Sequence, residues 1–139
     1  MEESRPGKGF QEITHTADLA MQVWGVDLFV LFARAALGML EIMGITMGGK
    51  KVFTKKIDLQ EDDLESLLVT FLSLILEEVE KNQIVYNDYN IQIKENTLSG
   101  SICGYCLKSM KREIKAVTFH DLKIVHAEKF YQTTLVFDI

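Results

Sequence analysis

The sequence is poor in proline and cysteine, and it contains no long apolar run. Its one proline is Pro6, so no proline interrupts a helix or strand later in the 139 residues. No apolar run reaches the roughly 18 residues of a membrane-spanning helix, and residues 1–9 lack the apolar segment of a signal peptide. We therefore expect a cytoplasmic protein with no membrane partner, in which the two cysteines, Cys103 and Cys106, are free thiols.

Basic residues are in the minority. There are 15 Lys and Arg against 20 Asp and Glu, which gives a net charge of −5. Proteins that bind nucleic acid strongly through its phosphates are normally basic, so we expect no strong direct nucleic-acid binding. A chain of this length can bury one core without disulfides. The sequence thus predicts one domain, residues 10–139, behind a flexible tail of residues 1–9.

Two segments predict helices. Asp27 is a suitable N-cap for residues 28–43, which are apolar on nearly every side, as in a helix that is buried on most of its surface. Gly44 is suited to end that helix. Asp62 and Asp63 precede residues 64–79, where apolar residues recur at three- and four-residue spacing, as in a helix that lies on a sheet.

The remaining segments predict strands, with a turn at Asn87–Asp88. The order is strands, helix, strand, helix, strands, which indicates an α+β fold with a mixed or antiparallel sheet packed with two main helices. The expected strands cover residues 10–15, 20–25, 51–59, 89–94, 98–107, 114–119, 122–127 and 131–137.

Cysteine and histidine do not form a recognisable metal or redox motif. Cys103-Gly104-Tyr105-Cys106 lies in a predicted strand, whereas a redox pair needs its first thiol at a helix N-terminus. The spacing of His15, His120 and His126 matches no zinc pattern. We interpret all five residues as structural.

The basic run from Lys108 to Lys115 has two interpretations. Lys108, Lys111 and Arg112 are typical of a solvated connector, although such a cluster also suits phosphate contacts. Lys115 lies inside a predicted strand, so its side chain should occupy a definite face. Lys115 is therefore a candidate contact to a phosphate or a partner.

Acidic residues at the two ends of the chain are candidate metal ligands. Asp18 lies in the polar stretch 15–18, which interrupts two strand-like runs and is either a turn or a site. The last predicted strand ends at Asp138 and Ile139, whose side-chain and terminal carboxylates repel unless a cation joins them. They are either solvated or, with Asp18 as third ligand, bind a cation that prefers oxygen, such as Ca²⁺, Mg²⁺ or Mn²⁺.

Several segments, in this order and separation, together resemble the archease family. The resemblance spans residues 10–139, and its motifs are specific as a set although each is modest. These motifs are His15-Thr16-Ala17-Asp18 with Trp24-Gly25, Ala35-Ala36-Leu37-Gly38, Asp63-Leu64-Glu65-Ser66-Leu67-Leu68, Glu113-Ile114-Lys115-Ala116-Val117-Thr118-Phe119-His120 and Val136-Phe137-Asp138-Ile139.

The resemblance implies a non-enzymatic activator of an RtcB-type RNA-splicing ligase, which joins a 3′-phosphate or 2′,3′-cyclic-phosphate end to a 5′-hydroxyl. Such an activator speeds transfer of GMP from GTP, bound only at the ligase, onto the ligase's own histidine, and so allows multiple turnover. The resemblance also implies a metal site of Asp18, Asp138 and the Ile139 carboxylate. We further expect His15 to orient Asp18 or its turn and Lys115 to offset negative charge, and both are candidate contacts to a partner or a phosphate.

Two departures and two alternatives accompany this reading. The loop at residues 108–112 is shorter than in many family members, and Cys103 and Cys106 inherit no role from the family. One alternative function is a metal-dependent hydrolase using His15, Asp18 and Asp138. The other is a chaperone or solubility modulator of RNA-modifying enzymes that uses the apolar helix 28–43.

Overall fold

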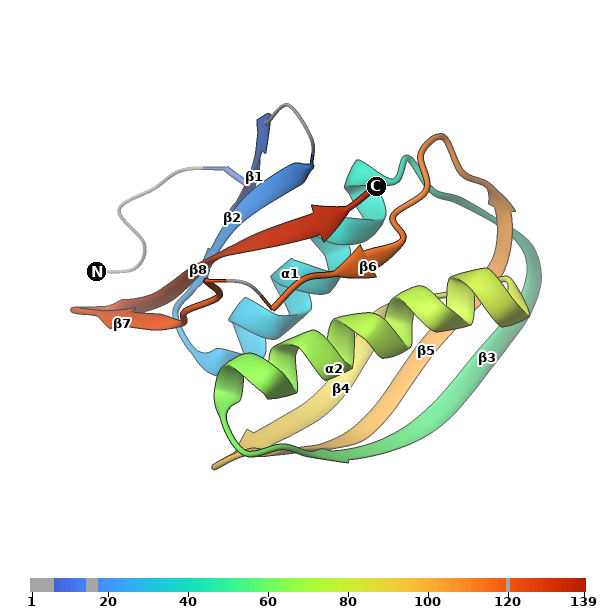
Figure 1. Ribbon diagram of the computed structural model, residues 1–139. Coiled ribbons are helices and arrows are strands. Elements are labelled where there is room, and N and C mark those ends of the chain that lie inside the picture. The colour runs from blue at the N-terminus through green and yellow to red at the C-terminus, as the bar shows by residue number, and fades with distance from the viewer. Residues whose placement is uncertain (1–6, 15–17, 120) are drawn as a thin grey trace.

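The computed structural model describes residues 7–14, 18–119 and 121–139, and its strands form two antiparallel sheets (Figure 1). The strands are β1 (Phe10–Thr14), β2 (Leu19–Gly25), β3 (Thr46–Gln60), β4 (Ile84–Lys94), β5 (Thr97–Ser109), β6 (Ala116–Val117), β7 (Val125–Ala127) and β8 (Phe130–Asp138). The five-stranded sheet has the order β1-β2-β8-β6, with β7 also paired to β8. The three-stranded sheet has the order β3-β5-β4.

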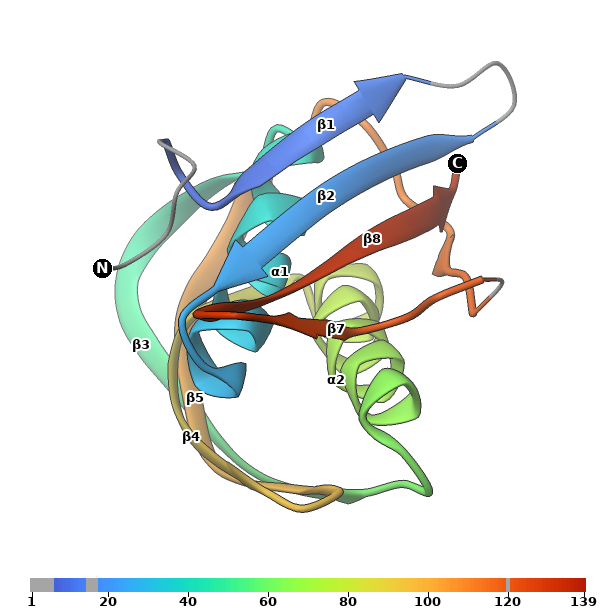
Figure 2. The ribbon, with the colours of Figure 1, turned by 90° about the vertical axis from the view of Figure 1, so that its left-hand side faces the viewer.

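Two helices, α1 (Leu28–Ile42) and α2 (Leu64–Glu77), lie between the sheets, and a short π-helix, η1 (Glu78–Asn82), extends α2 (Figure 2). Phe32 of α1 and Phe71 of α2 are fully buried, with ring centroids 6.0 Å apart. Tyr89 of β4 meets Phe71 edge-on at 5.7 Å. This aromatic contact chain joins both helices to the three-stranded sheet, and the predicted α+β domain is confirmed.

Both helix starts are capped as the sequence predicts. The Asp27 carboxylate accepts a hydrogen bond of 2.8 Å from the Val30 N–H, and the Asp63 carboxylate accepts one of 2.7 Å from the Ser66 N–H. The hydrogen bonds from Ser66 lower the pKa of Asp63 below its usual value. Gly44 follows α1 with a φ of +63°, a conformation that glycine adopts without strain. No helix in the described part of the chain is long and apolar enough to cross a membrane.

The strands are divided between two sheets rather than gathered in one, and α1 supplies the physical reason. Its buried residues include Leu31, Phe32, Ala35, Ala36 and Met39, which are distributed around much of the helix. A helix that is apolar on most sides needs cover on more than one side. Accordingly, α1 packs against β2 of one sheet and β4 of the other.

The predicted turn at Asn87–Asp88 is wrong, because β4 runs straight through these residues. The pairing of β4 with β5 is interrupted only by a register shift between Tyr86 and Asp88, which is a β-bulge. The Tyr89 hydroxyl donates a 2.6 Å hydrogen bond to the Tyr86 carbonyl beside this bulge. Pairing with β5 and burial of the flanking tyrosines outweigh the local turn preference of the Asn-Asp pair.

The strands expected at residues 114–119 and 122–127 are much shorter than predicted. β6 and β7 contain only two and three residues, and both pair with β8. Between them the chain is held in other ways. The Thr133 hydroxyl donates to the Lys123 carbonyl at 2.7 Å, and the Ile124 N–H donates to the Glu65 carboxylate at 2.9 Å.

Gly104 lies where β5 passes closest to β4, and we predict that Gly104→Ala destabilises the fold. A Cβ there would overlap the Val85 carbonyl, so the strands would have to separate, at a cost of about 2 kcal/mol in the free energy of unfolding. Gly48→Ala is the matched control, because its nearest contact would be 3.4 Å from Lys108 Cβ, and its effect should stay within about 1 kcal/mol. Urea unfolding measures both; equal effects would contradict the β4–β5 register.

Candidate functional site

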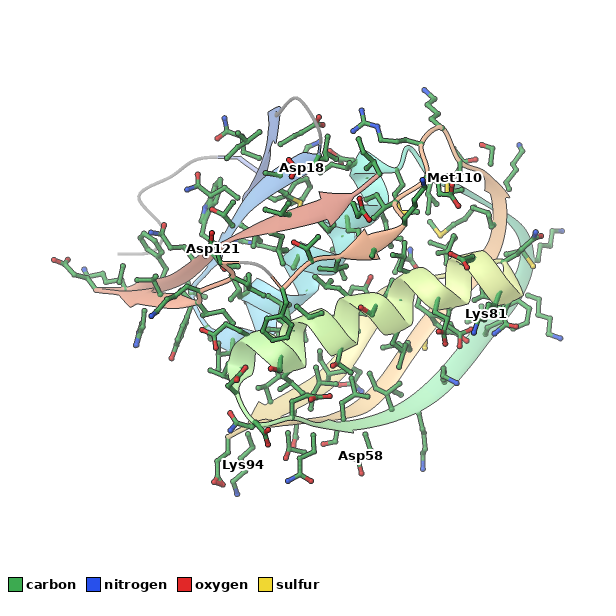
Figure 3. All side chains as sticks on the ribbon, viewed as in Figure 1. Asp18, Asp58, Lys81, Lys94, Met110 and Asp121 are labelled. Atoms are coloured by element: carbon green, nitrogen blue, oxygen red, sulfur yellow. The ribbon has the colours of Figure 1, made fainter. Side chains whose placement is uncertain are left out.

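The two predicted aspartate ligands come together where β2 begins and β8 ends. Leu19 pairs with Phe137, and continuing this antiparallel register by one residue places Asp18 opposite Asp138. Residues opposite one another in such a ladder have Cα atoms about 4.5–5.5 Å apart and side chains on the same face. Figures 1 and 2 both show the C-terminus next to the start of β2, and Figure 3 labels Asp18 there.

Both carboxylates belong to the outer face of the sheet. Leu19 and Phe137, the neighbouring pair, are buried in the core. Because successive side chains on a strand alternate between faces, Asp18 and Asp138 point away from that core. Asp18 is half-buried and Asp138 is exposed, so a partner can reach the Asp138 carboxylate from solvent.

The end of β8 is held from both sides. Asp138 pairs with Ala116 of β6, and its carbonyl accepts a 2.7 Å hydrogen bond from the Lys115 N–H. On the opposite edge, β8 pairs with β2 up to Phe137. Ile139 follows directly and is 45% exposed. The backbone before the last carboxylates is therefore anchored by pairing with two strands, while Asp138 and Ile139 are themselves exposed.

This donor set fits a hard cation. Carboxylate oxygens from Asp18, Asp138 and the Ile139 terminus are the ligands that Ca²⁺, Mg²⁺ and Mn²⁺ prefer. Among the described residues, no three side chains of His, Cys, Asp or Glu form a potential metal site. A metal site at this position would therefore need a main-chain carboxylate as its third ligand. His15, the other candidate in this region, lies outside the described residues.

Lys115 contributes its backbone and its side chain in different places. Its N–H binds the Asp138 carbonyl, as above, whereas its side chain lines a hollow between β6 and α2 together with Glu77 and Glu80. None of the ion pairs among the described residues joins Lys115 to either glutamate. Lys115 thus lies between the end of β8 and the acidic residues of α2 and η1.

The cysteines and the described histidine do not meet near the carboxylates. Cys103 and Cys106 are free and lie on β5, in the other sheet. His126 stacks on Tyr131 at 4.0 Å between β7 and β8, which is a packing role. His120 lies outside the described residues.

One feature was missed from the sequence: the lysine pair at the start of β3 lies beside the basic run that begins at Lys108. Residues 46–48 of β3 pair with residues 106–109 of β5, so Lys50 and Lys51 follow Gly48, over which the Lys108 stem lies, and Lys111 lies over Gly44 at the other end of this paired segment. The only hint in the sequence was the Gly48-Gly49-Lys50-Lys51 stretch, which is compatible with an irregular basic strand.

The fold and the site together define a small α+β protein whose candidate chemistry is a group of surface carboxylates at the meeting of its first hairpin and last strand. The Archease protein family model matches residues 10–139. An archease from Methanosarcina barkeri is 34% identical over 145 residues, covering 98% of this chain and 99% of the relative. Another, from Thermococcus kodakarensis, is 32% identical over 126 residues, covering 83% and 87% respectively. The chain belongs to the archease family.

Two solved structures share the fold. The crystal structure of an archease from Thermotoga maritima, described as a possible chaperone, superposes with a TM-score of 0.70 at 23% identity and covers 100% of both chains. The solution structure of protein 1598 from Methanobacterium thermoautotrophicum gives a TM-score of 0.68 at 24% identity, covering 96% of this chain and 100% of that one. Both therefore have this α+β architecture.

The two thiols should differ in reactivity, which tests their placement on β5. Cys106 is exposed, whereas Cys103 is half-buried with its Sγ 3.5 Å from the Thr54 hydroxyl. We predict that iodoacetamide alkylates Cys106 faster than Cys103 in the native protein, and at equal rates after unfolding in urea. Peptide mass spectrometry measures the two rates, and faster native labelling of Cys103 would contradict the strand orientation.

Proposed function

We propose that this protein activates an RtcB-type RNA-splicing ligase by promoting guanylylation of the ligase histidine. Membership of the archease family supports the choice of partner. The observation that carries the proposal is the register that sets Asp18 opposite Asp138, beside Ile139. The chain is then an accessory protein of the ligase in the cytoplasm, and GTP binds at the ligase alone.

The reaction to be helped is attack of a ligase histidine on the α-phosphorus of GTP. Phosphoryl transfer of this kind depends on positioning and on stabilising negative charge at the phosphate oxygens. Asp18, Asp138 and the Ile139 carboxylate would hold a divalent cation, Ca²⁺ or alternatively Mg²⁺ or Mn²⁺. When bound, this ion supplies positive charge that complements phosphate oxygens.

The protein's own contribution is placement. The carboxylates lie at the end of a sheet rather than in a deep cleft, so they can enter a cleft that belongs to the partner. The pairing of β8 with β2 and β6 holds the Asp138 backbone in position before docking, which lowers the entropy lost on binding. His15 would orient Asp18, and the Lys115 N–H, which donates to the Asp138 carbonyl, would hold the end of β8 in place.

The two alternative functions have less support. A hydrolase needs a substrate-sized pocket at its metal, and five hollows on the described surface are lined by residues other than Asp18 and Asp138. A chaperone that uses α1 needs that helix exposed, and most of α1 is covered by the protein's own sheets. The activator is therefore the function we propose.

Asp18→Ala should abolish most of the stimulation of guanylylation while the fold persists, because the site loses one of its two side-chain carboxylates. We expect at least about a 10-fold loss, together with weaker Ca²⁺ binding in calorimetry. Ligase guanylylation with labelled GTP, in the presence and absence of this protein, is the measurement. Asp58→Ala is the matched control, since Asp58 is an exposed aspartate on β3, far from Asp18 in Figure 3. Stimulation that survives Asp18→Ala unchanged would refute the carboxylate mechanism.

Extension of the chain beyond Ile139 should also weaken the site. Adding Gly-Ser-Gly moves the terminal carboxylate away from Asp138, so Ca²⁺ affinity should fall at least about 10-fold. The same tripeptide added before Met1 is the control and should leave the affinity unchanged. Circular dichroism establishes that both proteins fold. Full affinity in the C-terminally extended protein would remove Ile139 from the ligand set.

A further inference from the structure

A second surface feature stands apart from the carboxylates: four exposed lysines from two distant segments follow the same end of the β3–β5 ladder, Lys50 and Lys51 from β3 and Lys108 and Lys111 from β5 and the loop after it. We call them the lysine cluster. β3 and β5 are paired here, with Thr46 opposite Ser109 and Gly48 opposite Cys106. A 2.5 Å hydrogen bond between the Thr46 and Ser109 hydroxyls closes this end of the ladder.

Glycines leave space for two of these side chains. The stem of Lys108 lies over Gly48, where a Cβ would come within 3.4 Å of Lys108 Cβ. The stem of Lys111 lies over Gly44, where a Cβ would come within 2.8 Å of Lys111 Cβ. The Lys111 N–H also donates to the Met43 carbonyl at 3.0 Å. Their aliphatic parts are thus placed by packing, and their ammonium groups extend to solvent.

A bulge directs the other two lysines outward. Between Gly48 opposite Cys106 and Phe53 opposite Gly104, residues 49–52 of β3 face the single residue Tyr105 of β5. The extra residues bow away from the ladder and carry Lys50 and Lys51 with them. Lys51 Nζ lies 5.0 Å from the centroid of the Phe53 ring, a cation–π contact that restrains it.

The charge of the lysine cluster is not neutralised within the protein. None of its four ammonium groups forms an ion pair with a described residue, whereas the nearby Arg112 is paired with Glu12 at 3.6 Å. The whole chain carries a net charge of −5, so this concentration of positive charge is local and unusual. Like charges held near one another favour an external anion.

Protection of strand edges does not explain the whole lysine cluster. Lysines on exposed edges prevent sheets from pairing with one another, and β3 is an edge strand. Lys50 and Lys51 serve that purpose. Lys108 lies where β5 extends beyond its pairing with β4, which ends at Ile84 opposite Cys106, so Lys108 also borders an unpaired edge. Lys111 lies in the loop after β5, where no edge needs protection.

We propose that the lysine cluster binds the phosphate backbone of single-stranded RNA without sequence preference. Lysine is depleted in protein–protein interfaces but is a common point-charge ligand of phosphate, which favours nucleic acid over an acidic protein surface. Exposed Met47 and Met110, each 39% accessible, flank the lysines and offer apolar contact to unstacked bases. The net negative charge of the protein keeps the affinity for RNA low, in the range of non-specific complexes.

The position of the lysine cluster suggests what such binding achieves. Lys111 is four residues from Lys115, so the Cα atoms of these two lysines are at most about 14 Å apart. The Lys115 N–H in turn donates to the Asp138 carbonyl. Figure 3 shows Met110, within the same loop, on the same upper side of the molecule as Asp18. RNA bound to the lysine cluster would lie near the candidate metal ligands Asp18 and Asp138. The choice of RNA rests on the proposed function; the anion site itself does not.

Salt dependence tests the proposal quantitatively. Fluorescence anisotropy of a labelled single-stranded RNA of about 12 nucleotides, titrated with the full chain in KCl from about 20 to 200 mM, should give a slope of about −2.8 in log K against log salt for four phosphate contacts. Lys50→Gln with Lys108→Gln should halve that slope and weaken binding more than about 10-fold. Lys94→Gln with Lys129→Gln removes two exposed lysines outside the cluster and should change neither value.

Two results would overturn the proposal: no salt-dependent RNA binding at the lowest KCl concentration, or equal losses in the cluster and control variants. Weaker binding of the cluster variant to RNA-free ligase, with RNA binding unchanged, would overturn it as well and assign the surface to an acidic protein. An assay of ligase guanylylation in the absence of RNA distinguishes failure of this proposal from failure of the proposed function. The Lys50→Gln, Lys108→Gln variant should stimulate guanylylation fully in this assay, whereas Asp18→Ala should not.

Discussion

β2 and β8 pair from Leu19 opposite Phe137 to Gly25 opposite Tyr131, and the rest of the structure depends on this ladder. It joins segments more than a hundred positions apart in the sequence, completes the sheet that covers α1, and sets the inward row of Met21 and Leu135 against the core. The same alternation turns Asp18 and Asp138 outward. One register thus determines both which apolar residues are buried and which carboxylates meet; a slip of one residue would lose both.

The candidate site and the lysine cluster use strand pairing in the same way. Each is assembled from two segments that are distant in sequence, and each places charged groups on a surface whose backbone is hydrogen-bonded to neighbouring strands. Charged groups cost little at a solvated surface, so the protein can hold like charges together there without the desolvation penalty of a buried site. The acids and the lysines lie at neighbouring ends of the two sheets, and a partner that touches both meets charges of opposite sign.

Local sequence signals predicted local structure well. Asp27 and Asp63 identified both helix starts because a cap is formed within three residues. The turn predicted at Asn87–Asp88 was wrong because pairing with β5 overrode the local turn preference. Residues 114–127 contain less strand than predicted because β6 and β7 share one partner, β8. The residue chemistry offered Asp18 and Asp138 as joint ligands only as one of two interpretations, and the family resemblance favoured it. The proximity of Lys50 to Lys108 was not foreseen, because periodicity carries no information about long-range register.

The place of β8 in the chain also has a consequence for biosynthesis. A ribosome makes β1, β2, α1 and the β4–β5 hairpin before it makes β8, the strand that lies between β2 and β6. Until then β2 carries an open edge and the cover over α1 is incomplete, which exposes a nascent chain to misassociation. Docking of β8 both completes the five-stranded sheet and brings Asp138 beside Asp18, so a chain in which β8 has not docked lacks both.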